Sequence, residues 1–227
     1  FSTAYAIDEL GGDYRLSTNV YYNGTLKDGI LTGDIWIIGG GDMSLGSKFL
    51  NGEANRTKFL TDWSNKIIEK GIKQINGTIY VDGSKFGYEG VPDDWLWGDI
   101  GNYYGAHFSG AMVYDNLIEY HFKTTAAGKK TELLYTVPAQ DSLNFINNIL
   151  SSTKTSDNSY IFGAPYSYIR EGRGELPQNK TDFMVKGSLP NPELQLALDF
   201  SKSLIQLGVK HEGKVSSTRE NPISRPE

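Results

Sequence analysis

The feature that most limits how this chain can fold is a strand–helix–strand order between residues 30 and 82. Residues 30–38 and 78–82 are short runs rich in β-branched and aromatic residues, which is typical of strands. The segment between them ends before Gly71 and carries one apolar face at helical spacing: Phe59, Leu60, Trp63, Ile67 and Ile68. Elements in this order form a βαβ unit, whose crossover is right-handed. The order therefore predicts a sheet covered by a helix.

Further elements are expected at both ends of the chain. Residues 1–10 have the pattern of the last turns of a helix, closed by the glycines at residues 11–12, and residues 15–22 alternate as a half-buried strand. A final helix is expected from Pro192 to Gly208. Its expected inward residues are Leu194, Ala197, Leu198, Leu204 and Ile205.

The middle of the chain has a different residue pattern and is expected to be mostly strand. Residues 118–124 and 131–137 are predicted strands, and residues 160–170 and 181–186 are strand-like. One short helix is expected among them, capped by Asp141. Its apolar residues would be Leu143, Ile146 and Ile149.

Together these elements predict a mixed α/β (α+β) fold, a layered sheet-and-helix domain with an inserted β-rich subdomain. The layered domain is expected at residues 15–116 and 181–218, and the subdomain at residues 117–180. Insertions are tolerated where their two ends meet on the surface. We therefore expect Asn116 and Thr181 to lie close together.

Composition and charge exclude several classes of protein. The formal net charge of −5 is spread along 227 residues without a basic block, so no nucleic-acid-binding surface is expected. No apolar run approaches the roughly 18–20 residues of a membrane span. The absence of cysteine excludes disulfides and thiolate metal sites. The 26 glycines and 14 tyrosines favour a β-rich fold with many tight turns.

Two patterns resemble cofactor or metal sites but lack the required spacing. Residues 39–46, Gly-Gly-Gly-Asp-Met-Ser-Leu-Gly, follow a strand as a nucleotide-binding loop does. The next helix begins more than ten residues later, too far for its N-terminus to hold a phosphate. His107, His121 and His211 lie far apart and lack the i, i+4 spacing of a zinc-binding helix. We therefore expect no cofactor and no metal.

A third pattern imitates a serine enzyme. Residues 151–154, Ser-Ser-Thr-Lys, and residues 156–158, Ser-Asp-Asn, match two of the three signatures of penicillin-interacting serine enzymes. That chemistry needs a serine at a buried helix start with its lysine one turn later, where the amine can take the hydroxyl proton. Here both matches lie side by side in one polar run, and residues 186–188 have the wrong order for the third signature. We expect no catalytic residue in this chain.

The stretch best suited to binding is residues 95–110, Trp-Leu-Trp-Gly-Asp-Ile-Gly-Asn-Tyr-Tyr-Gly-Ala-His-Phe-Ser-Gly. It places aromatic rings and one acid, Asp99, among glycines. Rings give rigid contact area, glycines allow close approach, and a carboxylate suits a cationic or hydrogen-bonding group. Two simpler interpretations stay open. The rings can form a corner of the core, and Asp99 can cap the next turn by accepting an N–H bond from Gly101 or Asn102.

Several segments, in the same order, resemble the S13 peptidase family of penicillin-binding D-alanyl-D-alanine carboxypeptidases, the class C low-molecular-mass group. The matching segments are residues 1–4, 10–18, 33–45, 71–82, 95–106, 109–116, 186–193 and 207–213. They span nearly the whole chain. Each is weak alone, but the ordered set is specific.

The resemblance implies a fragment of a β-lactamase-like multidomain enzyme of the cell envelope, periplasmic or extracellular. In family members the serine nucleophile and its lysine precede a stretch like Thr3-Ala4, and the other motifs follow one like residues 221–227. This chain would then hold inserted domains without the catalytic motifs. Residues 1–14 would end a helix of the missing penicillin-recognising domain, which alone would bind β-lactams, and residues 219–227 would lead back to it.

The resemblance also implies substrate contacts. In family members an acid and an aromatic residue five positions later help hold the third residue of the peptidoglycan stem peptide, commonly diaminopimelate. The matching positions are Asp99 and Tyr104, with Trp97 nearby. A carboxylate suits a side-chain ammonium, and rings can flank its methylenes.

Two functions remain in competition at this point. The first is the non-catalytic central part of an exported D-Ala-D-Ala carboxypeptidase/endopeptidase, a serine acyl-enzyme acting on peptidoglycan. The second is a stand-alone peptide- or glycan-binding module of the cell envelope.

Overall fold

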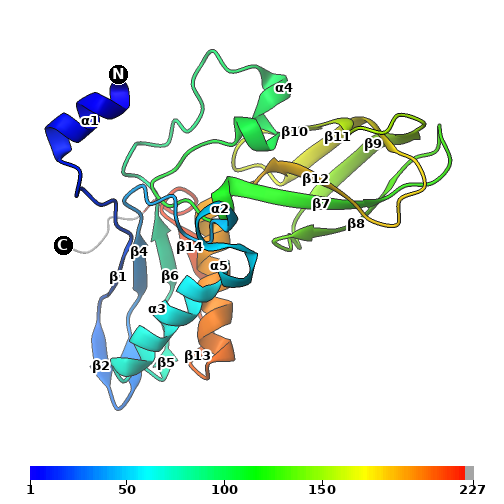
Figure 1. Ribbon diagram of the computed structural model, residues 1–227. Helices are drawn as coiled ribbons and strands as arrows, with labels where there is room; N and C mark the ends of the chain where they lie inside the picture. The colour runs from blue at the N-terminus through cyan, green and yellow to red at the C-terminus, as the bar shows by residue number, and fades with distance from the viewer. Residues whose placement is uncertain (223–227) are drawn as a thin grey trace.

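Two short four-stranded sheets combine strands from residues 19–82 with two strands from residues 210–217. The structure is a computed structural model that describes residues 1–222 (Figure 1). One sheet has the order β1-β4-β6-β14, with β1 (Asn19–Tyr22), β4 (Ile35–Ile38), β6 (Ile79–Asp82) and β14 (Val215–Ser217). The other has the order β13-β5-β3-β2, with β13 (Lys210–His211), β5 (Gln74–Ile75), β3 (Ile30–Thr32) and β2 (Thr25–Lys27). As the strand–helix–strand order predicts, β4 and β6 are parallel neighbours.

The run at residues 30–38, expected as one strand, is divided between β3 and β4 in different sheets. Gly33 lies at the break, where a β-carbon would stand 2.2 Å from the Asn23 carbonyl oxygen. Asp34 holds the bend, because its N–H donates to Asn23 Oδ1 at 2.6 Å and its Oδ1 accepts the Thr78 N–H at 2.8 Å. The close backbone approach at Gly33 thus decides where one sheet stops and the next begins.

The chain also forms helices. They are α1 (Ser2–Leu10), α2 (Lys48–Asn51), α3 (Lys58–Glu69), α4 (Trp97–Ile100) and α5 (Pro192–Gln206), with single 3-10 turns η1 (Glu53–Asn55), η2 (Tyr103–Gly105) and η3 (Tyr114–Asn116). α3 and α5 pack against each other through a 2.9 Å hydrogen bond between Ser64 Oγ and Ser203 Oγ and an edge contact of Trp63 with Phe200. α1 ends at Gly11 as expected; it buries no residue and stands apart from the sheets in Figure 1.

α5 begins and ends where the sequence predicts, but its buried face differs, because Leu194 and Leu198, both expected inward, are only partly buried. The Asn191 side chain accepts the Leu194 N–H at 3.0 Å as the N-cap, and Gly208 follows the helix with φ of 90°. Ile205, expected inward, is 52% exposed. The fully buried apolar residues are Leu196, Ala197, Phe200 and Leu204.

The second half of the chain forms two three-stranded sheets. One has the order β12-β7-β8, with β12 (Phe183–Ser188), β7 (Leu117–Lys123) and β8 (Glu132–Val137). The other has the order β10-β11-β9, with β10 (Asn158–Phe162), β11 (Ile169–Pro177) and β9 (Asn144–Ser152). Tyr120 and Phe122 of β7 pack on Phe145 of β9, with ring centroids 5.2 and 5.7 Å apart. Aromatic contacts therefore join the two sheets.

The short helix expected after Asp141 is wrong, because residues 144–152 are strand β9. β9 pairs with β11 along all nine residues, and its burial alternates so that Ile149 is buried while Ile146 is 46% exposed. Spacings of three residues between Leu143, Ile146 and Ile149 resemble a helical face, yet nine paired residues outweigh that weak local signal. The single strand expected at residues 160–170 is also wrong. These residues contain the end of β10 and the start of β11, which are separate strands.

The expectation that Asn116 and Thr181 lie close together is also wrong. β7 and β12 are antiparallel with Leu117 opposite Ser188, and the Leu189 N–H donates to the Asn116 carbonyl at 2.8 Å. Thr181 lies beyond the other end of this pair, about 20 Å away at ~3.3 Å per residue. The division of the chain into domains stays a prediction, and this register favours a boundary after β12.

The chain enters β7 through a left-handed turn. Tyr114, Asp115 and Asn116 have φ of 58°, 59° and 51°, a region that costs a non-glycine residue about 1–2 kcal/mol. Tertiary contacts hold it, since the Tyr114 hydroxyl donates to Asp199 at 2.9 Å and Asn116 Nδ2 donates to the His107 carbonyl at 2.6 Å. Packing on both sides of the turn therefore fixes a backbone shape that the local sequence does not favour.

Replacing Gly33 with alanine is expected to destabilise the fold. The new methyl group would overlap the Asn23 carbonyl, and such overpacking costs about 1–3 kcal/mol of unfolding free energy. Gly12→Ala is the matched control, because nothing lies within 4 Å of a β-carbon there. Urea unfolding of both variants tests this, and equal stability of the two would contradict the steric account of the break.

Candidate functional site

Residues 95–110, which contain α4 and η2, dock between the two sheets of the β-rich part. Asn102 makes the connection and is only 4% exposed. Its Nδ2 donates to the Gly98 carbonyl at 2.7 Å, and its Oδ1 accepts the Ile161 N–H of β10 at 2.9 Å. Its backbone forms an isolated bridge with Gly187 of β12. Contacts with both sheets therefore fix the position of the aromatic segment.

The structure brings together two of the three residues expected to bind substrate. Tyr104 is 53% exposed, and Asp99 lies beside it, partly buried. Partial burial and the neighbouring Asp99 carboxylate, which accepts a hydrogen bond from the phenol, raise the pKa of Tyr104. Trp97 is 55% exposed and lies two residues before Asp99 on α4. That spacing places the two side chains on different sides of a helix.

The Asp99 carboxylate is available for a further partner. The Asn102 N–H donates to the Asp99 backbone carbonyl at 2.9 Å rather than to its side chain. Within residues 1–222, no lysine or arginine lies within salt-bridge distance of this carboxylate. A charge-assisted bond to a ligand ammonium is the chemistry that this arrangement offers.

A cavity of about 400 Å³ adjoins Tyr104, and we call it the tyrosine groove. Its lining residues are Asn102, Tyr103, Tyr104, Asp157, Asn158, Ser159, Tyr160, Met184, Val185 and Lys186. The three tyrosines are each about half exposed, at 51–53%. The Lys186 ammonium lies 5.7 Å from the centroid of the Tyr103 ring. The groove thus combines aromatic surface with one positive charge.

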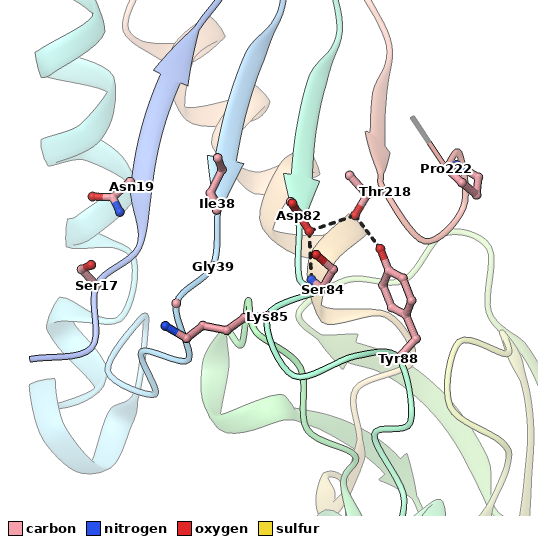
Figure 2. Close-up of a pocket in the computed structure, with 11 residues that line it drawn as sticks. Ser17, Asn19, Ile38, Gly39, Asp82, Ser84, Lys85, Tyr88, Thr218 and Pro222 are labelled. Carbon is pink, nitrogen blue, oxygen red and sulfur yellow. Dashed lines mark hydrogen bonds between the residues drawn. The ribbon is translucent and has the colours of Figure 1, made fainter. Parts of the chain in front are cut away.

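A larger cleft, about 800 Å³, lies where β4, β6 and β14 end (Figure 2). Asp82 organises it, because its Oδ1 accepts the Ser84 N–H at 2.9 Å and the Thr218 hydroxyl at 3.2 Å. The Thr218 hydroxyl lies 2.9 Å from that of Tyr88, and Lys85 extends toward the chain after β4. The carboxyl ends of parallel strands commonly hold ligands in α/β sheets. The sequence did not predict this hydroxyl-rich cleft.

A buried polar cluster, also missed from the sequence, joins α5 to the β-rich part. Glu193 is 1% exposed and accepts bonds from the Ser109 hydroxyl at 2.6 Å and the Tyr166 hydroxyl at 3.0 Å. Burial raises the pKa of Glu193, and the hydrogen bonds oppose this only in part. A β-carbon on Gly83 would stand 2.4 Å from the Glu193 carboxylate. The sequence places Glu193 in the first turn of a predicted helix, where an acid is favoured whether it is buried or exposed, so the cluster could not be predicted.

The serine and lysine of residues 151–154 do not form a catalytic pair. Ser151 lies on β9, 2% exposed, and its hydroxyl accepts the Thr125 N–H at 3.0 Å. Lys154 pairs with Glu175 at 3.0 Å instead. Because Lys154 is paired with Glu175, its amine is not placed to take the proton of the Ser151 hydroxyl.

The three histidines have separate structural partners. His211 Nδ1 lies 2.7 Å from the Ser201 hydroxyl, and His121 Nδ1 lies 2.7 Å from Asp182. His107 is buried against the Tyr166 ring, with centroids 4.8 Å apart. Among the described residues, no three histidine, aspartate or glutamate side chains gather as metal ligands.

The comparison with known families decides the identity of the chain. The model of the D-Ala-D-Ala carboxypeptidase 3 (S13) family matches residues 1–226. The chain belongs to the S13 family. This confirms the resemblance seen in the ordered segments.

Solved structures confirm the mixed fold of this S13 chain. It is similar to the crystal structure of penicillin binding protein 4 (dacB) from Haemophilus influenzae, with a TM-score of 0.73 and 18% identity over all of this chain and 47% of that one. A second structure of that protein, complexed with a novel beta-lactam, gives a TM-score of 0.65 and 16% identity over 44% of its chain. The S13 chain therefore spans less than half the length of these relatives. None of its described helices is long and apolar enough to cross a membrane.

Acid is expected to destabilise the protein through His107. Burial, followed by the charges of Arg170 and Arg219, lowers the pKa of His107 from 6.5 to about 4. The unfolded chain therefore takes up a proton below pH 6.5 that the folded chain does not. Between pH 7 and pH 5 this lowers the free energy of unfolding by about 2 kcal/mol.

The matched variant is His107→Phe, which keeps a ring but cannot titrate. Urea unfolding at pH 7, 6 and 5 should show a steeper loss of stability for the unmodified protein than for the variant. Parallel pH profiles for the two proteins would contradict the depressed pKa.

Proposed function

We propose that this chain is the non-catalytic central part of an exported S13 D-Ala-D-Ala carboxypeptidase/endopeptidase and recognises peptidoglycan stem peptides. The observation that carries the proposal is the pair of Asp99 and Tyr104, a partly buried carboxylate without a basic partner among residues 1–222 beside a half-exposed ring. The serine that is acylated and deacylated would lie in parts of the enzyme outside this chain. The enzyme would work in the periplasm or outside the cell, and β-lactams would bind its other domain.

The arrangement of the strands supports an inserted unit. β1 is antiparallel to β4, whereas β6 and β14 run parallel to β4, so the start of β1 and the end of β14 lie at the same end of the sheet, on its two outer strands. Residues before β1 and after β14 therefore leave on the same side, as insertion into another domain requires. In this proposal residues 1–14 and 219–222 lead from and to that domain; residues 223–227 lie outside the described part.

Asp99 and Tyr104 would act on the third residue of the stem peptide. The Tyr104 phenol is protonated at neutral pH, so its hydroxyl donates to Asp99 and orients the carboxylate. The remaining acceptor positions of Asp99 suit a side-chain ammonium, and the Tyr104 ring offers surface to the methylenes before it. Trp97, exposed on the same short helix, would add a second aromatic surface.

This chain is expected to have no acyl-enzyme chemistry of its own. It should neither hydrolyse D-Ala-D-Ala peptides nor retain a fluorescent penicillin after denaturing electrophoresis, because Ser151 is buried and Lys154 is paired elsewhere. An S13 enzyme that labels under the same conditions is the positive control. A stable adduct on Ser151 would overturn the non-catalytic assignment.

Asp99→Asn is expected to weaken binding of peptides with an amine at the third position. A charge-assisted bond contributes about 1.5–3 kcal/mol, so the dissociation constant of a lysine-containing stem peptide should rise roughly 10- to 100-fold. The same peptide with norleucine at that position should bind both proteins equally. Isothermal titration calorimetry measures both constants.

Asp94→Asn is the matched control, because Asp94 is an exposed acid on the same segment. It should leave both constants unchanged. Equal losses on the lysine and norleucine peptides, with a lowered melting temperature, would show that Asp99 has a structural role and end the recognition proposal.

A further inference from the structure

The tyrosine groove lies between the free edges of two sheets. β12 is the outer strand of the order β12-β7-β8, and β10 is the outer strand of the order β10-β11-β9. Residues 184–186 of β12 and residues 158–160 of β10 both line the groove. An edge strand offers unpaired N–H and C=O groups to an additional strand unless something covers them.

The edge of β10 is covered. The Ile161 N–H donates to Asn102 Oδ1 at 2.9 Å. The next N–H on the same side, that of Ser159, donates to Asp157 Oδ1 at 2.8 Å, and the Ser159 hydroxyl donates to the same oxygen at 2.7 Å. Side chains therefore occupy the donors that an incoming strand would need on this wall.

The edge of β12 is open at Met184. The Ser188 N–H donates at 2.9 Å to the Gly101 carbonyl on the groove side, whereas the Leu189 N–H donates to Asn116 on the β7 side. Because backbone groups alternate along a strand, those of Lys186 and Met184 also face the groove. The bridge between Asn102 and Gly187 covers the Lys186 end. Within residues 1–222, no backbone hydrogen bond outside the sheet ladder reaches the Met184 N–H.

The charge of the groove suits an acidic ligand group. Lys186 lies on a regular strand with its ammonium over the Tyr103 ring. Among the described residues, no carboxylate lies within salt-bridge distance of Lys186; Glu119, opposite it in register, pairs with Lys48 at 2.6 Å. The Asp157 carboxylate on the other wall already accepts two hydrogen bonds. A carboxylate entering the groove would therefore find one available cation.

We propose that the tyrosine groove binds an extended peptide as an added strand on β12, with a free carboxylate of that peptide paired to Lys186. The Met184 N–H and C=O would supply main-chain hydrogen bonds, the basis of affinity when a peptide extends a sheet. Tyr103, Tyr104 and Tyr160 would flank its side chains. The choice of a stem peptide as the occupant rests on the proposed function. The link is Tyr104, which lines the groove and contacts Asp99.

The probe is a synthetic peptide, N-acetyl-L-Ala-γ-D-Glu-L-Lys-D-Ala amide, whose glutamyl α-carboxylate is its one anionic group. A second probe carries a carboxamide in place of that carboxylate, and a third carries norleucine in place of lysine. Calorimetric titration of this chain with the first two should show tighter binding of the carboxylate probe. Lys186→Met should weaken the carboxylate probe about tenfold and leave the carboxamide probe unchanged. Lys210→Met, on β13 in the other part of the molecule, is the matched control.

The strand addition is tested at Met184. Proline is tolerated on an edge strand whose N–H faces outward, so Met184→Pro should fold, yet weaken both the carboxylate and the carboxamide probe about tenfold or more. Met184→Leu keeps the N–H and should bind as the unmodified protein does. If the proline variant fails to fold, amide hydrogen exchange replaces it: the carboxylate probe should slow the exchange of the Met184 N–H in the unmodified chain.

The outcomes separate this inference from the proposed function. Lack of binding by the carboxylate probe would overturn both the groove and the proposed function. Equal effects of Lys186→Met on the carboxylate and carboxamide probes, or unchanged Met184 exchange, would overturn the groove alone. A difference between lysine and norleucine probes that depends on Asp99 would survive that result. Conversely, carboxylate and Met184 dependence with equal binding of lysine and norleucine probes would support the groove and overturn the assignment of Asp99.

Discussion

A buried carboxylate, that of Glu193, joins segments from both halves of this molecule. It stands at the start of α5, accepts bonds from Ser109 and Tyr166, and lies against the backbone of Gly83 after β6. Four segments distant in the chain therefore converge on one acid. An acid in such a place is tolerated because hydrogen bonds compensate part of its desolvation, and removing either hydroxyl would take away part of that compensation.

The position of Asp99 and Tyr104 depends indirectly on the Glu193 cluster. In residues 95–110, Ser109 donates to Glu193. Asn102 accepts a hydrogen bond from β10 and forms a backbone bridge with β12. Tyr104 lies on η2 between these anchors, and Asp99 lies on α4, three residues before Asn102. The buried anchors thus help to hold Asp99 and Tyr104 in place, although α4 and η2 are too short to be stable alone.

The sequence predicts the parts of this fold that rest on strong local signals. The end of α1 at Gly11, the bounds of α5 and the parallel pair of β4 and β6 follow from residue type and spacing. Residues 144–152 do not, because their pairing with β11 is a long-range interaction that no local pattern encodes. The resemblance indicated Asp99 and Tyr104 as site residues but not the hydrogen bond between them. The Glu193 cluster could not be expected, since a first-turn glutamate is usually solvated.

The open edge of β12 also bears on how the protein avoids self-association. An uncovered edge strand is normally a template for sheet-to-sheet aggregation. Here the edge is recessed between η2 and β10, and the Asn102 bridge closes one end of it. Little of the β12 edge is therefore free for a sheet of another molecule to pair with, whereas a single extended chain needs only the backbone groups near Met184.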